Sequence, residues 1–178
     1  MRVSAFMFLA PVLLFTAGCA HSPSSLPEPA PDFNLADFFK RPVGPKGLEP
    51  TPELLAMKGK RAQIKGYMVM EEDPVPGLFM LTPRPVSMAE LADGPSDFLP
   101  PATLFVHLPK PAEAKIAAYR PGIWTVTGTL ELGAKHEANE RVSYVRLIPD
   151  DTEVILAPEG EVPQFLESGT ASVGHYHH

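Results

Sequence analysis

The stretch PGIWTVTGTLEL, residues Pro121 to Leu132, is the clearest β-strand in this 178-residue sequence. Apolar residues and one glycine recur at every second position, and threonines fill most of the positions between them. Side chains alternate between the two faces of a strand, so this period of two predicts one inward and one outward face. The residues predicted to share the inward face are Trp124, Val126, Gly128, Leu130 and Leu132.

A second stretch, RAQIKGYMVM from Arg61 to Met70, follows the same design. Its inward face carries Ala62, Ile64, Gly66, Met68 and Met70, again with a glycine at the third inward position. Glycine weakens the middle of a strand and usually marks a bulge or a bend where a sheet curls. Two such strands predict a small curled sheet or barrel.

The remaining pattern predicts a mainly β domain over residues 51–149, with three more strands and two short helices. The helices are expected at Thr51 to Gly59, where a threonine caps a proline-led first turn, and at Pro111 to Tyr119. The strands are expected at Leu78 to Thr82, Thr103 to Leu108 and Val142 to Ile148, and one further turn of helix at Ser87 to Ala92. Three strands, a helix and two strands is the order of the OB-fold, a five-stranded barrel.

The segments on either side of this domain differ from it in composition. Residues 19–50 are rich in proline and serine, which predicts an extended tether. Residues 150–178 form an acidic tail, predicted to be flexible apart from Val154 to Leu156, and it ends in His175, His177 and His178. Within the tether lies an apolar patch of Phe33, Leu35, Phe38 and Phe39. Docking of this patch on the domain is favoured over a linear motif for a partner.

The amino terminus is typical of a secretory signal, because Arg2 precedes an apolar run that is too short to span a bilayer. The following Thr16-Ala17-Gly18-Cys19 resembles the lipobox of bacterial lipoproteins. This resemblance implies that residues 1–18 are removed and that Cys19, the single cysteine, carries the lipid. Ordinary cleavage after Ala20 is the alternative. In enterobacterial lipoproteins an alanine after the cysteine resembles the pattern sent to the outer membrane.

The predicted domain also resembles a known group of proteins over roughly Lys58 to Ile148. The segments that carry this resemblance are GKRAQIKGYM, WTVTGTLEL and YVRL. They are similar to bacterial periplasmic lipoproteins of unassigned function that carry OB-like domains. The resemblance implies an OB-like fold and a periplasmic location, and it brings no catalytic or binding residues with it.

Several function classes are disfavoured by the sequence. A formal net charge of −6 disfavours nucleic acid as a partner. There is no G-x-S-x-G motif and no phosphate-binding glycine loop. The segment His136 to Glu140 is similar to the zinc-protease helix motif, but Glu140 stands where the second histidine is needed. We therefore expect a solvated hairpin loop there, and predict no catalytic residue, no cofactor and no enzyme.

A soft-metal site is the one chemical hypothesis with some content. Met68, Met70 and Met80 lie on two neighbouring predicted strands, and a thioether set together with His107 and Trp124 suits Cu(I). Ordinary core packing is the favoured interpretation of these methionines. The three histidines at the end of the tail would bind Zn(II), Ni(II) or Cu(II) weakly, because a tail offers no supporting contacts. No residue is assigned as a metal ligand.

We expect a lipid-anchored protein of the cell envelope that faces the periplasm, more specifically at the outer membrane. Its barrel is expected to be a non-catalytic binding or assembly module for an envelope protein or polymer. The expected binding region is the barrel face with the loops Pro83 to Pro101 and Gly133 to Arg141. The alternative is a periplasmic copper- or zinc-binding protein. The oligomeric state is left open by the sequence.

Overall fold

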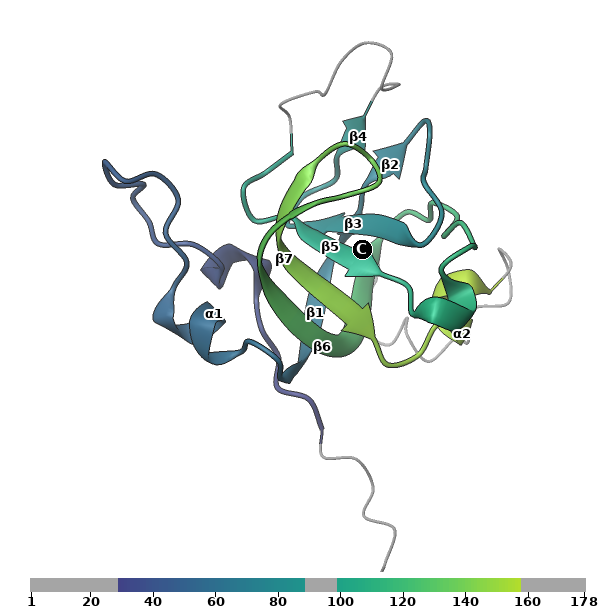
Figure 1. The fold of residues 1–178 in the computed structure, drawn as a ribbon, viewed down its shortest axis with the longest axis horizontal. Coiled ribbons are helices and arrows are strands. Elements are labelled where there is room, and N and C mark those ends of the chain that lie inside the picture. Colours follow the sequence, from purple (N-terminus) through teal and green to yellow (C-terminus); the bar gives the residue numbers. More distant parts are fainter. Residues whose placement is uncertain (1–28, 89–98, 158–178) are drawn as a thin grey trace, which may run out of the picture.

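A computed structural model describes residues 29–88 and 99–157 of the chain. Five of the described strands wind into a closed barrel in the order β1-β3-β5-β7-β6 (Figure 1). The barrel strands are β1 (Arg61–Met68), β3 (Leu78–Thr82), β5 (Leu104–His107), β6 (Ile123–His136) and β7 (Val142–Pro149). The predicted mainly β, five-stranded barrel is therefore confirmed.

Neighbouring barrel strands run antiparallel, with one exception. β5 and β7 run parallel, with Phe105 opposite Arg146 and Val106 opposite Leu147. A small separate sheet pairs β2 (Met70–Glu71) in parallel with β4 (Ser87–Met88). Three barrel strands, a short helical turn and two closing strands make the chain order of the OB-fold.

The two glycines in the middle of strands mark places where chain segments come unusually close. A Cβ on Gly128 would lie 2.7 Å from Leu147 Cδ2, and one on Gly66 would lie 2.8 Å from Leu35 Cδ1. The pairing of β1 with β6 runs through both glycines without a shift in register. The sequence predicted a bulge or bend here, and the close approach of neighbouring segments is the reason that the structure gives.

The barrel core follows the predicted alternation except at the ends of the two strands. The predicted inward residues that are buried are Ala62, Ile64, Gly66, Met68, Val126, Gly128 and Leu130. Met70, in contrast, is 42% exposed. The Val69 N–H donates to the Met80 carbonyl and the Met70 N–H donates to the Val86 carbonyl. The chain thus leaves the barrel after Met68, and Met70 belongs to β2 of the separate sheet and not to the inward face of β1.

One of the two predicted helices forms and the other does not. Helix α1 (Pro52–Ala56) is capped by Thr51, whose side chain accepts from the Leu54 N–H at 3.2 Å. The predicted helix at Pro111 to Tyr119 is wrong, because only the 3-10 turn η3 (Lys110–Ala112) forms. The Lys115 carbonyl, which a helix would use internally, accepts instead from the Gly77 N–H at 2.8 Å.

The loop between β3 and β5 was predicted to hold a turn of helix. The first two residues of that predicted turn form strand β4 instead, because the Met70 N–H of β2 bonds to the Val86 carbonyl beside them. Residues 89–98 of this loop lie outside the described part of the chain.

The amino-terminal boundary of the domain differs from the prediction. Residues 29–50, which we call the arm, already pack on the barrel and contain the 3-10 turn η1 (Leu35–Asp37). The Phe33 N–H donates to the Gln63 carbonyl, and Leu35 and Phe38 are fully buried. The predicted tether up to residue 50 is therefore wrong for the arm, and the predicted docking of the phenylalanine patch is confirmed.

The carboxy-terminal boundary also moves outward. Helix α2 (Glu153–Leu156) buries Ile155, and Arg120 Nη2 donates to the carbonyls of Val154 and Ile155 at 3.1 and 2.7 Å. The folded unit thus runs past residue 149, in line with the predicted order at Val154 to Leu156. Cys19 and the three terminal histidines lie outside the described residues. No helix within residues 29–88 and 99–157 is long and apolar enough to cross a lipid bilayer.

Candidate functional site

The outer face of β3 and β5 carries a second small core, which we call the outer cluster. Its buried members are Val69, Leu78, Met80, Met88 and Phe105. In OB-folds the face of the second and third strands, with the loops beside it, commonly binds ligands. In this protein the segment after β1, strand β4 and the hairpin between β6 and β7 cover that face. The usual OB-fold binding face is therefore filled by the protein's own side chains.

A buried polar network lies under the β6–β7 hairpin, and Glu137 is its centre. The Glu137 side chain is 2% exposed and accepts a hydrogen bond from the Ser143 hydroxyl. His107 Nε2 lies 3.1 Å and Lys135 Nζ 3.4 Å from its Oε2. Strands β5, β6 and β7 each contribute to these contacts, so the network ties the hairpin to the barrel.

Arg146 extends this network to the bulge in β6. Its Nη1 donates to the Gly133 carbonyl at 2.6 Å and to the Ser143 hydroxyl at 3.0 Å. The pairing of β6 with β7 shifts register between Leu132 and Lys135, and Gly133 there has a φ of 122°, which favours glycine. The bulge and the network together set the position of the hairpin tip.

Burial and neighbouring charges shift the pKa values of three ionisable groups near the hairpin. Burial alone would raise the pKa of Glu137, but the Ser143 hydroxyl, His107 and Lys135 together hold it below its usual range. Burial lowers the pKa of His107 although Glu137 opposes this. Burial raises the pKa of Glu71, against a hydrogen bond from Asn139 and the charge of Arg141. At neutral pH the network therefore holds an ionised Glu137 beside an uncharged imidazole.

This network does not have the order of a catalytic triad. A serine nucleophile needs the histidine beside its hydroxyl, with the carboxylate behind the histidine. Here Ser143 and His107 both contact the Glu137 carboxylate. Ser143 is also completely buried. The network is thus suited to holding the hairpin in place.

The hairpin tip connects the outer cluster with a surface groove. Asn139 is buried, and its Nδ2 lies 3.9 Å from the Met80 sulfur of the outer cluster. Glu140 has a φ of 60°, in the left-handed region that a non-glycine residue adopts at a cost of about 1–3 kcal/mol. This turn places Glu140 at one end of the groove, and Arg141, the next residue, also lines the groove.

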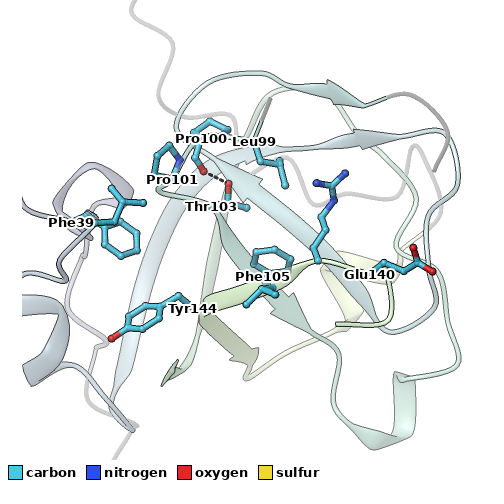
Figure 2. A pocket seen from close by; sticks show the side chains of 11 residues that line it. Phe39, Leu99, Pro100, Pro101, Thr103, Phe105, Glu140 and Tyr144 are labelled. Carbon is cyan, nitrogen blue, oxygen red and sulfur yellow. Dashed lines mark hydrogen bonds between the residues drawn. The ribbon is translucent and has the colours of Figure 1, made fainter. Parts of the chain in front are cut away.

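The groove has a volume of about 590 Å³ and lies where β5 and β7 begin, beside the arm. Figure 2 shows Phe105 near its centre, Phe39 and Tyr144 on one side, and Glu140 at the far end. The lining residues are Phe39, Leu48, Leu99, Pro100, Pro101, Thr103, Phe105, Glu140, Arg141, Val142 and Tyr144. Five of these eleven residues are aromatic or proline, and three more are aliphatic.

Three different parts of the fold position these walls. The arm brings Phe39 to within 6.0 Å of Tyr144 on β7, measured between ring centroids. The Thr103 hydroxyl donates to the Pro100 carbonyl at 2.6 Å and fixes the chain as it enters β5. Because Phe38 is fully buried next to Phe39, the core anchors the arm wall.

Two smaller hollows of about 220 and 250 Å³ continue the groove along the arm. The first shares Phe39, Leu48 and Pro101 with the groove, and the second shares Lys40 and Pro42 with the first. The charged residues around the three hollows are Lys40, Arg41, Lys46, Glu49, Glu140 and Arg141. We call the three hollows together the extended groove.

The structure does not bring the predicted soft-metal set together. Met68 lies inside the barrel, Met80 belongs to the outer cluster and Met70 is 42% exposed. His107 faces Glu137, and Trp124 lies under the Arg120 guanidinium at 4.7 Å. Within the described residues no three histidine, cysteine, aspartate or glutamate side chains are grouped as metal ligands would be.

The predicted binding loops contribute only part of the groove. Of the loop Gly133 to Arg141, Glu140 and Arg141 line it, and of the loop Pro83 to Pro101, Leu99 and the two final prolines do. Sequence reasoning named Phe39 only as part of the docking patch and missed Leu48 of the arm, because proline-rich composition indicated a tether. It also missed Phe105 and Tyr144, which alternation places on the outward faces of their strands. The phenylalanine patch was the one signal that pointed to the arm.

Comparisons with known proteins identify no family for this chain. No family model matches the sequence, and no curated protein matches it. A crystal structure of a DUF3299 family protein from Pseudomonas aeruginosa is similar to this chain, with 14% sequence identity and a TM-score of 0.43. The alignment covers 69% of this chain and 95% of that protein. A similarity of this degree carries no argument about function.

Proposed function

We propose that the protein is a lipid-anchored protein of the cell envelope whose barrel is a non-catalytic binding module. In this proposal Cys19 carries the lipid, the domain faces the periplasm, and the groove binds an envelope protein or polymer. The observation that carries the proposal is the groove itself, a hollow of about 590 Å³ whose lining combines aromatic side chains, prolines and aliphatic side chains with Thr103, Glu140 and Arg141.

The character of the walls supports a role in binding. Leu48 and Val142 are 45% and 56% exposed, and both line the groove. Contiguous exposed apolar residues on a soluble domain commonly mark an interaction site. Tyrosine, phenylalanine and proline lose little conformational freedom when a partner is bound, so they offer contact area at low entropic cost.

The chemistry of the lining supports a non-catalytic role. Among the described lining residues Glu140 is the single carboxylate, and there is no histidine or cysteine. A nucleophile paired with a base is therefore absent from the described lining. The titratable residues with shifted pKa values lie around the hairpin, and none of them belongs to the groove lining.

The proposed anchor and the arm together limit how far the domain can lie from a membrane. Residues 19–28 separate Cys19 from the first described residue of the arm. A fully extended chain spans at most about 3.3–3.6 Å per residue, so these ten residues reach about 35 Å. Partners of the groove would therefore lie close to the membrane surface.

The proposal is tested by photocrosslinking in intact envelopes. A benzoylphenylalanine at position 48 replaces Leu48 in the groove, and one at position 116 replaces Ile116, which is 50% exposed and lies outside the extended groove. We expect a discrete crosslinked product from position 48 that position 116 does not give. Equal products from both positions, or none from position 48, would contradict the proposal.

A further inference from the structure

Strand β7 has an unpaired edge that faces the groove. On one side β7 pairs with β6 along its length, from Val142 opposite His136 to Pro149 opposite Gly128. On the other side β5 lies opposite only Arg146 and Leu147. No residue of β5 therefore stands opposite the first half of β7 in the ladder, and its backbone groups on that edge have no strand partner among the described residues.

This unpaired edge lies within the groove. Val142 and Tyr144, from the first half of β7, line the groove together with Thr103 and Phe105 at the start of β5. The walls that face them are Phe39 from the arm and the Pro100–Pro101 segment (Figure 2). An unpaired strand edge presents a row of N–H and C=O groups, and an extended peptide can pair with such a row.

The charge around the extended groove is opposite to that of the chain. Lys40, Arg41, Lys46 and Arg141 outnumber Glu49 and Glu140, whereas the whole chain has a formal charge of −6. Arg141 lines the large hollow, and the three lysine and arginine residues of the arm line the two smaller ones, where Lys40 Nζ lies 3.0 Å from Glu49 Oε2. This excess of positive charge is complementary to an acidic ligand.

The length of the unpaired edge of β7 suits the addition of a short peptide strand. The unpaired part of β7, from Val142 to Val145, spans about 10 Å at 3.3 Å per residue. In an extended peptide alternate side chains point the same way, so one set would contact the rings of Phe39, Phe105 and Tyr144. The other set would point away from these rings.

We infer that the groove binds an extended acidic peptide segment, which adds as a short strand to the unpaired edge of β7 between Val142 and Val145. This inference rests on the proposed function and names the class of partner, a protein with an exposed acidic and apolar segment. Backbone pairing supplies affinity, the aromatic walls select apolar side chains, and the basic residues around the extended groove select acidic ones.

The inference is tested with the full-length protein, purified in detergent, and three fluorescent heptapeptides. The parent peptide has the sequence EVEFEVE, and two N-methylated forms block the N–H groups of one or the other strand edge. Fluorescence anisotropy should give saturable binding of the parent. Only one edge of the peptide pairs with β7, so one methylated form should bind about tenfold more weakly and the other should bind like the parent.

Charge and site are tested in the same assay. The peptide KVKFKVK should bind at least about tenfold more weakly than the acidic parent at low salt. Tyr144→Ala should weaken binding of the parent, and the matched surface variant Ile116→Ala should leave it unchanged. Equal binding of both methylated forms, equal binding of the basic peptide, or no binding of the acidic peptide would overturn the inference.

The two proposals fail in distinguishable ways. A crosslinked product from position 48 without binding of the acidic peptide would leave the groove as a binding site for another class of partner, such as an anionic polysaccharide. Loss of both signals would overturn the proposed function as well.

Discussion

Two apolar surfaces lie on the outside of this barrel, and they meet at Phe105. On one side of that ring the outer cluster is buried, with Met80 fully enclosed. On the other side the groove leaves Leu48 and Val142 about half exposed. The difference comes from the segments laid over the barrel and not from the barrel strands. It teaches that loops and arms decide which face of an OB barrel is available to a partner.

The covering segments differ in how they are attached. The chain after β1 is held over the outer cluster by backbone bonds, including Val69 to Met80 and Met70 to Val86. The arm bonds its backbone to Gln63 of β1 and buries Leu35 and Phe38, but at the groove it contributes only one wall. The chain after β1 therefore covers the outer cluster, whereas the arm leaves a hollow between itself and β7.

The largest loss of stability is expected when a buried side chain of the outer cluster is removed. Met80→Ala removes a fully buried side chain and should lower the free energy of unfolding by about 2–5 kcal/mol. The matched variant Met70→Ala removes a partly exposed methionine outside the outer cluster and should lower the free energy of unfolding by much less, about 0.5 kcal/mol. Urea denaturation followed by tryptophan fluorescence measures both. Similar losses for both variants would mean that the outer cluster is not a packed core.

A smaller effect is expected when the support of the hairpin is weakened. Glu137→Gln keeps the shape but removes the charge that faces His107, Lys135 and Ser143, and should lower the free energy of unfolding by about 1–3 kcal/mol. Because the hairpin also ends the groove, peptide binding should weaken too. Glu131→Gln alters a half-exposed partner of Arg146 and should have little effect on stability. Equal effects of the two substitutions would contradict the central role of Glu137.

The same network predicts a dependence of stability on pH. Burial holds the pKa of His107 below 6.5, so at mildly acidic pH the unfolded chain binds a proton there that the folded protein does not. Stability is then complete above pH 6.5 and falls as the pH falls toward the pKa of the folded state. His107→Gln should reduce the fall in the free energy of unfolding between pH 7.5 and about pH 5.5. An unchanged or steeper fall would contradict this assignment.

The smallest effect on the fold is expected at the proposed anchor. Cys19→Ala should leave the unfolding free energy unchanged, since Cys19 lies outside the described domain. It should block processing of the precursor at this site and release the protein from washed membranes. Fractionation followed by mass spectrometry of the amino terminus measures this. A variant that stays with the membranes like the parent would contradict the lipid anchor.

The barrel could be predicted from the sequence because its strands depend on local alternation. Val126, Gly128 and Leu130 are buried at every second position as the pattern requires, and pairing along β1 and β6 preserves that period. The exposure of Met70 could not be predicted, since it depends on where the chain leaves the barrel to pair with β4. Competition for the Lys115 carbonyl is likewise invisible in the sequence.

The candidate site was predicted in part only, for a physical reason. Proline-rich composition argues against helix and strand, but it does not prevent phenylalanines between the prolines from being buried, as Phe38 is. The contact of His107 with Glu137 joins residues thirty positions apart, which only the closure of the barrel brings together. Outward residues such as Tyr144 acquire a role only when the arm packs beside them.

The route of the arm has a mechanical consequence. A pull on the chain from its amino-terminal side would first load the hydrogen bonds that Gln63 makes with Pro31 and Phe33. It would next have to extract the buried side chains of Leu35 and Phe38 before it could move Phe39. Two attachments, the backbone hydrogen bonds and then the buried side chains, would therefore have to break before a pull could displace the wall of the groove. A domain tied to a moving surface would keep the shape of its groove until both attachments had broken.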